Sequence, residues 1–167
     1  CMTSAPSYDP ENKPSNIDTD TTGKYDGVYI NRLLSGKFTP GSTFKVVTAI
    51  SALENISDIS ERTFTCTGEY KTKDGAVKCS GVHGKVTFRQ ALNKSCNCAF
   101  AQIATELGKR KLTATAKELG FNTKISACGT VLAISSFNVD KASEAELGWA
   151  GIGQHTTLSN PCHMMMI

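Results

Sequence analysis

A serine and a lysine stand three residues apart in the stretch TPGSTFKVVTAISALEN, residues 39–55. Ser42 follows a Pro-Gly turn and precedes an apolar segment, which places it at the start of a predicted helix. Positions i and i+3 of a helix lie on the same side, so the Lys45 amine can reach the Ser42 hydroxyl. A partly buried lysine loses proton affinity and can act as a base. The pair therefore has the spacing of a serine nucleophile and its general base.

The start of a helix adds a second feature to this pair. Its partial positive charge favours the oxyanion of a tetrahedral intermediate, and the backbone N–H of Ser42 is a natural donor to that oxyanion. However, Ser-x-x-Lys occurs by chance about once in a chain of this length. The same residues also fit a capping serine followed by a solvated lysine, and the spacing alone leaves both interpretations open.

A second candidate motif is Ser95-Cys96-Asn97, in the stretch LNKSCNCAFAQIATELG. It lies between two helical segments, where a short turn can direct Ser95 and Asn97 into a cleft. Ser136-Phe137-Asn138 has the same spacing, but it lies in an irregular segment without a following helix, so we interpret it as a coincidence. A third element, GIGQ at 151–154, precedes a Ser-x-Pro helix start and lacks the Lys-Ser/Thr ending of a phosphate loop.

Hydrophobic spacing indicates the elements around the first motif. Residues 1–27 are rich in Pro, Ser, Asp and Asn, and we expect an extended, loop-rich segment there. A firm helix is expected to begin at Ser42. One buried face of this helix is predicted from apolar residues that recur every three positions, namely Phe44, Val47, Ile50 and Leu53.

The rest of the chain alternates turn signals with helical patterns. Residues 63–86 are expected to form short strands or loops with a turn at Asp74-Gly75, and Thr87 is expected to cap a helix over FRQALNK. Gly108 is expected to end a helix that begins near Cys98. Ser159, as N-cap, and Pro161 predict the start of a last helix.

Length, composition and charge exclude several classes of protein. The 167 residues suffice for one domain with a core, and 40% hydrophobic and 20% charged residues are ordinary for a soluble globular protein. The net charge of +3 comes from scattered lysines, so nucleic-acid binding is not expected. No apolar run approaches the roughly 20 residues of a membrane span, and the first residues lack the features of a signal peptide. Any anchor or export signal is expected outside this chain.

The cysteines leave two interpretations open. They are seven in number: Cys1, Cys66, Cys79, Cys96, Cys98, Cys128 and Cys162. They contain no paired Cys-x-x-Cys set, so a structural zinc site is not expected. Cys66 and Cys79 flank the turn-rich stretch CTGEYKTKDGAVKC and should lie near each other. They could form a disulfide in an oxidising compartment or remain two buried thiols.

Taken together, PGSTFK, KSCNCAF and GIGQ before a helix, in this order and spacing, resemble the transpeptidase domain of penicillin-binding proteins. The segment SAPSYDPEN is similar to the one that precedes the first helices of the high-molecular-weight members. The stretch from FTCTGEY to ATELG is also similar to the family, so the resemblance covers nearly the whole chain. It implies an α+β fold of the β-lactamase/transpeptidase type, mainly its helical subdomain, with no cofactor and no metal.

The resemblance also implies a role for each motif residue. Ser42 would be the acylated nucleophile, Lys45 its base, Ser95 a proton relay to the leaving amine, and Asn97 a ligand of the substrate amide. Cys96 would occupy the variable middle position. The implied function is a peptidoglycan D,D-transpeptidase that cross-links stem peptides at the extracytoplasmic face of the bacterial membrane and is acylated by β-lactams.

One motif of the family is missing from the chain. No Lys-Thr/Ser-Gly is present, TTGK at 21–24 has the wrong order, and the chain stops at Ile167, before the family would place that strand. We therefore expect a single partial domain over 1–167, with the loop-rich segment 1–27, a helix-rich catalytic part 42–167 and no C-terminal strands. Such a chain alone is expected to react poorly with penicillin.

Two alternatives remain open at this point. The first is a serine β-lactamase or β-lactam sensor, which shares Ser-x-x-Lys; PSYDPEN and GIGQ favour the synthase instead. The second is a catalytically inert scaffold or a partner-binding fragment in which the motifs are relics.

Overall fold

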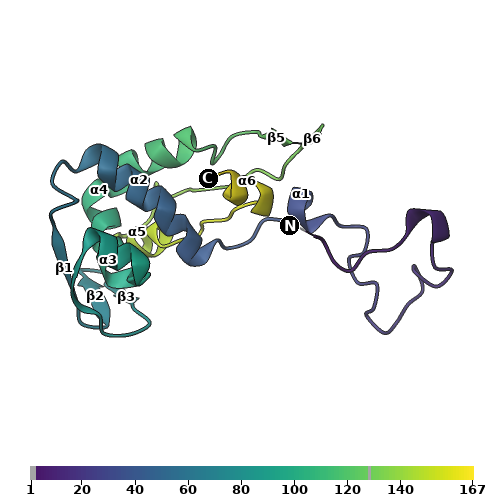
Figure 1. Ribbon diagram of the computed structural model, residues 1–167, viewed down its shortest axis with the longest axis horizontal. Helices are drawn as coiled ribbons and strands as arrows, with labels where there is room; N and C mark the ends of the chain where they lie inside the picture. Colours follow the sequence, from purple (N-terminus) through teal and green to yellow (C-terminus); the bar gives the residue numbers. More distant parts are fainter. Residues whose placement is uncertain (1–2, 128) are drawn as a thin grey trace.

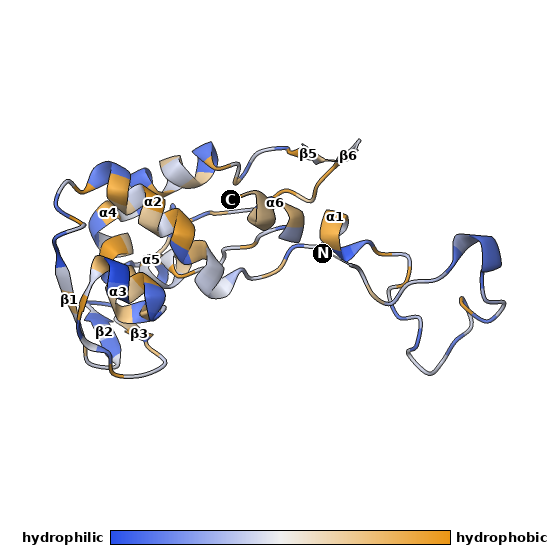
Figure 2. Ribbon diagram, viewed as in Figure 1, coloured by the Kyte–Doolittle hydropathy of each residue, from blue (hydrophilic) through white to orange (hydrophobic). Residues whose placement is uncertain are grey.

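The computed structural model describes residues 3–127 and 129–167. In Figure 1, the helices α2 to α5 and the strands β1 to β3 pack into one body, and the N-terminal segment extends away from it. Residues 3–31 contain turns and one short 3-10 helix, Pro10–Asn12, which is hydrophilic in Figure 2. The Pro, Asp and Asn content of this segment favours such turns.

Helix α4 (Asn97–Glu118) lies at the centre of the body, in contact with both α2 (Lys45–Asn55) and α5 (Glu144–Gly151). Small residues allow the close approach of α5: a Cβ atom added at Gly148 would lie 3.2 Å from the Ala101 Cβ. Gly108 has φ +70° and ψ 169°, so it interrupts the helical geometry of α4, as its sequence position predicts. Within the described residues, none of the helices combines the length and the apolar character that a membrane span needs.

The helix that carries the first motif begins differently from the prediction. Residues Gly41–Phe44 form a 3-10 turn, and α2 starts only at Lys45. Side chains at i and i+3 are eclipsed in a 3-10 turn, so this geometry still aligns Ser42 with Lys45.

The predicted buried face of α2 is wrong at its C-terminal end. Phe44 and Val47 are fully buried, but Leu53 is 56% exposed. Three residues of an α-helix rotate by about 300°, which is about 60° less than a full turn. Three such steps therefore place Leu53 on about the opposite side of the helix from Phe44. The observed buried face instead includes Val47, Ala52 and the polar residues Thr48 and Ser51.

In the part of the chain that the structure describes, three two-stranded antiparallel sheets complete the fold, which is α+β as predicted. Strand β1 (Thr63–Cys66) pairs with β4 (Gly84–Thr87), β2 (Glu69–Thr72) with β3 (Gly75–Lys78), and β5 (Ser126–Ala127) with β6 (Thr130–Val131). The chain reverses between β2 and β3 at the predicted Asp74-Gly75 turn.

The cap of the helix α3 (Phe88–Asn93) follows the prediction. The Thr87 side chain accepts a hydrogen bond from the Gln90 N–H, and the Gln90 side-chain oxygen accepts one from the Thr87 N–H, which together form a capping box. The two short helices α1 (Arg32–Ser35) and α6 (Pro161–Met166) contact each other.

The last helix starts one residue later than predicted. Its N-cap is Asn160, not Ser159, because the Asn160 side chain accepts the His163 N–H. The Asn160 amide also donates to the carbonyls of Leu33, Leu34 and Gly36 at 2.8, 3.0 and 2.9 Å. Buried Asn160 therefore fastens the chain segment that leads to Ser42 onto the start of α6.

Candidate active site

Ser42 and Lys45 form the centre of the candidate site. Ser42 is exposed in the 3-10 turn, whereas the Lys45 side chain is buried, with 1% of the residue surface exposed. The Lys45 Nζ lies 3.0 Å from the Ser42 Oγ. An accessible hydroxyl thus contacts a shielded amine, which is the arrangement that an activated serine needs.

The second motif meets the same amine from another part of the chain. Lys45 Nζ lies 2.8 Å from the Ser95 Oγ, 2.8 Å from the Ser95 carbonyl oxygen and 2.7 Å from the Asn97 Oδ1. The structure therefore brings together all four residues that the sequence nominates. Ser136-Phe137-Asn138 lies elsewhere: Phe137 is buried against the ring of Phe44, and Ser136 pairs through its backbone with Leu158.

The turn that presents Ser95 is conformationally unusual. Ser95 connects α3 to α4 and has φ +52°, a region that residues other than glycine rarely adopt. Backbone bonds from Ser95 N–H to the Leu92 carbonyl (2.9 Å) and from Cys96 N–H to the Ala91 carbonyl (2.8 Å) hold the turn. Strain of this kind persists only where the surrounding structure fixes it, and it is frequent at functional sites.

Burial changes the acid–base chemistry of Lys45. The loss of water around the ammonium lowers the pKa of Lys45 below 10.5, while the negative charge of Cys79 and Cys96 in their thiolate forms acts in the opposite direction. A neutral lysine amine has two hydrogens and one lone pair. Its hydrogens can be donated to the Ser95 carbonyl oxygen and the Asn97 Oδ1, and the lone pair then remains to accept the Ser42 proton.

Asn97 links this amine to the strand β3. Its Oδ1 accepts from Lys45, and its Nδ2 donates to the Lys78 carbonyl at 2.9 Å. A carboxamide offers two donors and two acceptor lone pairs, so one of each remains for a ligand. Asn97 can therefore contact Lys45 and a further polar group at the same time.

The GIGQ segment supports the turn that carries Ser42. The Gly41 N–H donates to the Gly153 carbonyl at 2.9 Å, and the Thr48 hydroxyl donates to the Gly151 carbonyl at 2.6 Å. Gly153 has φ +77°, and an added Cβ atom there would overlap the Gly41 carbonyl oxygen. The sequence locates this turn, but its packing against the nucleophile follows only from the fold.

Behind the second motif lies a group of thiols. Cys66 and Cys79 are near each other, as predicted. Both are free thiols in the structure, so no disulfide joins them there. Cys96 and His83 complete a set in which one ligand atom per residue lies within 4.8 Å of all the others. His83 was not among the residues nominated from the sequence, although it follows Cys79 by four positions; that spacing is the only local signal that could have indicated it.

The protonation behaviour of these thiols differs with their surroundings. Burial raises the pKa of Cys79, but hydrogen bonds from the backbone amides of Cys98, Gly81 and Asn97 outweigh it and lower the pKa to about 6. Burial raises the pKa of Cys96 to about 12. The Cys79 thiol is therefore deprotonated more readily than the Cys96 thiol.

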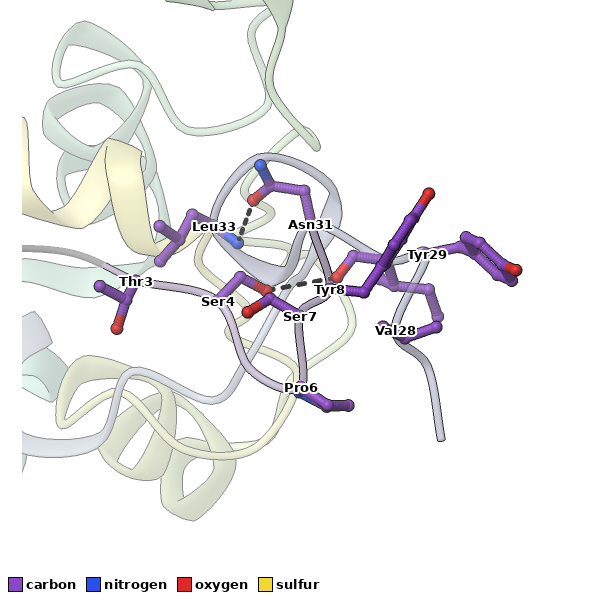
Figure 3. A pocket seen from close by; sticks show the side chains of 10 residues that line it. Thr3, Ser4, Pro6, Ser7, Tyr8, Val28, Tyr29, Asn31 and Leu33 are labelled. Atoms are coloured by element: carbon purple, nitrogen blue, oxygen red, sulfur yellow. Dashed lines mark hydrogen bonds between the residues drawn. The ribbon is translucent and has the colours of Figure 1, made fainter. Parts of the chain in front are cut away.

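A separate pocket of about 470 Å³ opens on the N-terminal segment (Figure 3). Tyr8, Val28 and Tyr29 line it, together with Ser4, whose hydroxyl donates to the Ile30 carbonyl at 3.3 Å. None of the four motif residues lines this pocket. It is distinct from the candidate active site.

The family model of the penicillin binding protein transpeptidase domain matches residues 1–166. The chain belongs to this family. Among curated relatives of this transpeptidase domain, the peptidoglycan D,D-transpeptidase PbpA of Mycolicibacterium smegmatis is 30% identical over 176 residues. That match covers 96% of the chain and 35% of PbpA, so the chain spans about a third of the length of this relative.

Solved transpeptidase structures have the same fold. The D,D-transpeptidase domain of a peptidoglycan glycosyltransferase from Eggerthella lenta superposes with a TM-score of 0.85 at 28% identity, covering 99% of the chain and 44% of that domain. The penicillin G acyl-enzyme complex of penicillin-binding protein A from M. tuberculosis gives 0.80 at 25% identity, covering 97% of the chain and 40% of that protein. The fold predicted from the motifs is thereby confirmed.

Proposed function

We propose that this penicillin-binding protein transpeptidase domain cross-links peptidoglycan through an acyl-enzyme on Ser42. One observation carries the proposal: a single buried amine, Lys45 Nζ, contacts Ser42 Oγ, Ser95 Oγ and Asn97 Oδ1 at 2.7 to 3.0 Å. A capping serine with a solvated lysine would not produce this convergence, because its amine would point into water.

The acylation step follows from these contacts. Neutral Lys45 accepts the Ser42 proton while Ser42 Oγ bonds to the carbonyl carbon of the terminal D-Ala–D-Ala peptide bond. The negative charge that develops on the carbonyl oxygen is stabilised by the Ser42 N–H, since the first amides of a helix have no intrahelical acceptor.

Collapse of the tetrahedral intermediate requires a proton on the leaving amine. Lys45 now holds that proton, and Ser95 Oγ lies 2.8 Å from it, so Ser95 can accept it and donate its own to the leaving nitrogen. D-Ala departs and leaves an ester on Ser42. In the second step, the amine of a neighbouring stem peptide attacks the ester and the same residues return the protons.

This function places the protein at the extracytoplasmic face of a bacterial membrane, where stem peptides are found. β-Lactams present a reactive amide in a ring and would acylate Ser42 in the same way. The penicillin G complex of the M. tuberculosis relative supports this part of the proposal.

Intact-mass spectrometry tests the role of Ser42. The protein, prepared at the full length that its gene encodes, is incubated with penicillin G and compared with Ser42→Ala and with Thr43→Ala as the matched neighbour. We expect one penicillin added to the wild type and to Thr43→Ala, and none added to Ser42→Ala. An adduct that persists in Ser42→Ala would place the nucleophile elsewhere and overturn the proposal.

A second measurement separates a synthase from a β-lactamase. A transpeptidase holds the penicilloyl ester for much longer than the acylation takes, and it releases D-Ala from a donor peptide only when Ser42 is present. Rapid hydrolysis of the ester with repeated turnover of penicillin would contradict the proposed synthase and favour a β-lactamase.

A further inference from the structure

Three thiols and one imidazole converge behind the Ser95–Asn97 motif. Cys66 ends β1, Cys79 follows β3, His83 precedes β4, and Cys96 is the middle residue of the motif itself. Their ligand atoms all lie within 4.8 Å of one another. Cys66 and Cys96 are fully buried, and Cys79 and His83 are half-buried.

The distances match those of a tetrahedral metal centre. Zinc binds thiolate sulfur at about 2.3 Å and imidazole nitrogen at about 2.0 to 2.1 Å, so a tetrahedral centre separates S and N by about 3.6 Å. His83 Nδ1 lies 3.7 Å from Cys66 Sγ and 3.5 Å from Cys79 Sγ. The imidazole nitrogen thus already has the separation from both sulfurs that a common zinc ion would impose.

We propose that Cys66, Cys79, His83 and Cys96 bind a zinc ion that holds the Ser95–Asn97 motif in place. Three cysteines and one histidine form one of the common ligand sets of structural zinc sites. Such a site was not expected from the sequence, because the chain has no paired Cys-x-x-Cys. Here Cys79 and His83 share the loop between β3 and β4, and only the fold brings this loop together with Cys66 and Cys96.

Two features favour the metal over a disulfide between Cys66 and Cys79. A disulfide would use two sulfurs and would leave both Cys96 and His83 without a function in the cluster. In addition, the Asn97 backbone N–H donates to Cys79 Sγ at 3.3 Å. Hydrogen bonds to the ligand atoms from a surrounding shell orient and stabilise the ligands of a metal site.

The site joins the motif to two strands. Cys96 lies between Ser95 and Asn97, while Cys66 and Cys79 belong to the ends of β1 and β3. A metal shared by these sulfurs would fix Cys96, and with it the strained φ of +52° at Ser95. Because Ser95 and Asn97 both contact Lys45, the zinc would act as a positioning element for the acylation machinery.

Metal analysis tests the site directly. The protein is purified with reduced thiols and without chelators and is then desalted. Its zinc content is measured by elemental mass spectrometry. We expect about one zinc ion per chain, with losses to near zero in Cys79→Ser and Cys96→Ser. Cys162→Ser is the matched control, because Cys162 is a free, half-buried thiol outside the cluster, and it should keep its zinc.

A spectroscopic readout covers variants that do not fold. Cobalt added to the chelator-treated wild-type protein should give thiolate-to-metal absorption and the visible bands of a tetrahedral ion, and zinc should displace them. A wild type without stoichiometric zinc and without these bands would overturn the proposal. So would zinc that persists in Cys79→Ser, or two thiols missing from a denatured, unreduced sample, which would show the disulfide.

The positioning effect is measured separately and depends on the proposed function. Removal of zinc should slow penicillin acylation of Ser42 by about 10- to 100-fold, since small displacements of catalytic groups have effects of that size. Zinc should restore the rate, and Cys162→Ser should respond like the wild type. Stoichiometric zinc without acylation of the loaded protein would contradict the proposed function alone, and an unchanged rate after complete removal would overturn the positioning role.

Discussion

Lys45 Nζ and Asn97 Oδ1 lie 2.7 Å apart although 52 residues separate them in the sequence. This contact joins the start of α2 to the start of α4, and it places the Ser-x-x-Lys motif and the Ser-x-Asn motif on one amine. The amine is buried, so its proton affinity and its orientation are both set by the protein rather than by water.

The first prediction concerns the pH dependence of acylation. Only neutral Lys45 can accept the Ser42 proton, so the acylation rate should rise with pH and level off above the pKa of Lys45 in the folded protein. Burial lowers that pKa, so the midpoint of the rise should lie below pH 10.5. The measurement is the rate of labelling by a fluorescent penicillin across the pH range.

Lys45→Met provides the control for this profile, since it keeps the length of the side chain and removes the amine. The variant should lose about 10²- to 10⁴-fold in rate, together with the pH dependence. Lys73→Met, at an exposed position, should behave like the wild type. A pH profile that is unchanged in Lys45→Met would show that another group is the base.

The second prediction separates the two Ser-x-Asn sequences of the chain. Ser95→Ala removes the hydroxyl that lies 2.8 Å from Lys45 Nζ and should slow acylation by about 10²-fold. Ser136→Ala has the same change of residue at the same motif spacing but belongs to the segment paired with Leu158, so its rate should not change. Equal losses in both variants would mean that the effect is one of stability, not of proton relay.

Local patterns predicted much of the fold and half of the site. The Ser42–Lys45 contact, the Thr87 capping box and the break at Gly108 depend on residues at most a few positions apart, so their spacing was informative. The buried face of α2 failed at Leu53, because a strict three-residue spacing drifts around a helix.

Long-range relationships could not be predicted in the same way. The proximity of Ser95 to Lys45 spans 50 residues, and Cys66 and Cys96 meet the Cys79–His83 loop from two other segments, so both relationships require the tertiary fold. Family resemblance supplied the first of these relationships. It did not supply the second, because only Cys79 and His83 are close in the sequence, and Cys66 and Cys96 lie outside their loop.

The third prediction tests the support of the nucleophile by the GIGQ turn. Gly153→Ala would place a methyl group onto the Gly41 carbonyl oxygen at a φ of +77°. The strain of a non-glycine residue in this region costs about 1–3 kcal/mol, and the overlap adds to it by displacing the turn that carries Ser42. We therefore expect both a lower free energy of unfolding and slower acylation.

Gly129→Ala isolates the two contributions. Gly129 has a similar φ of +75°, but among the described residues beyond its chain neighbours no atom lies within 4 Å of an added Cβ atom. This variant should show the loss of stability from backbone strain while acylation stays as in the wild type. If Gly153→Ala acylates as fast as Gly129→Ala, the turn does not position Ser42.

The last prediction concerns the acid sensitivity of the fold. The Asp74 carboxylate, in the turn between β2 and β3, accepts the backbone N–H groups of Glu144 and Ala145 at the start of α5, at 2.8 and 2.9 Å. These bonds favour the charged form and lower the pKa of Asp74 from 3.8 to about 2. The unfolded chain therefore binds more protons at this group than the folded chain does between these two values.

It follows that the stability contributed by Asp74 is fully present above pH 3.8 and is lost as the pH falls towards 2. Asp74→Asn should lower the free energy of unfolding at neutral pH, and the difference from the wild type should shrink in acid. Asp26→Asn, at an exposed aspartate of the N-terminal segment, is the matched control and should change neither quantity. Chemical denaturation at several pH values measures the free energy of unfolding and its pH dependence. If the difference in this free energy between Asp74→Asn and the wild type stays constant down to pH 2, the carboxylate charge does not stabilise the contact between α5 and the β2–β3 turn.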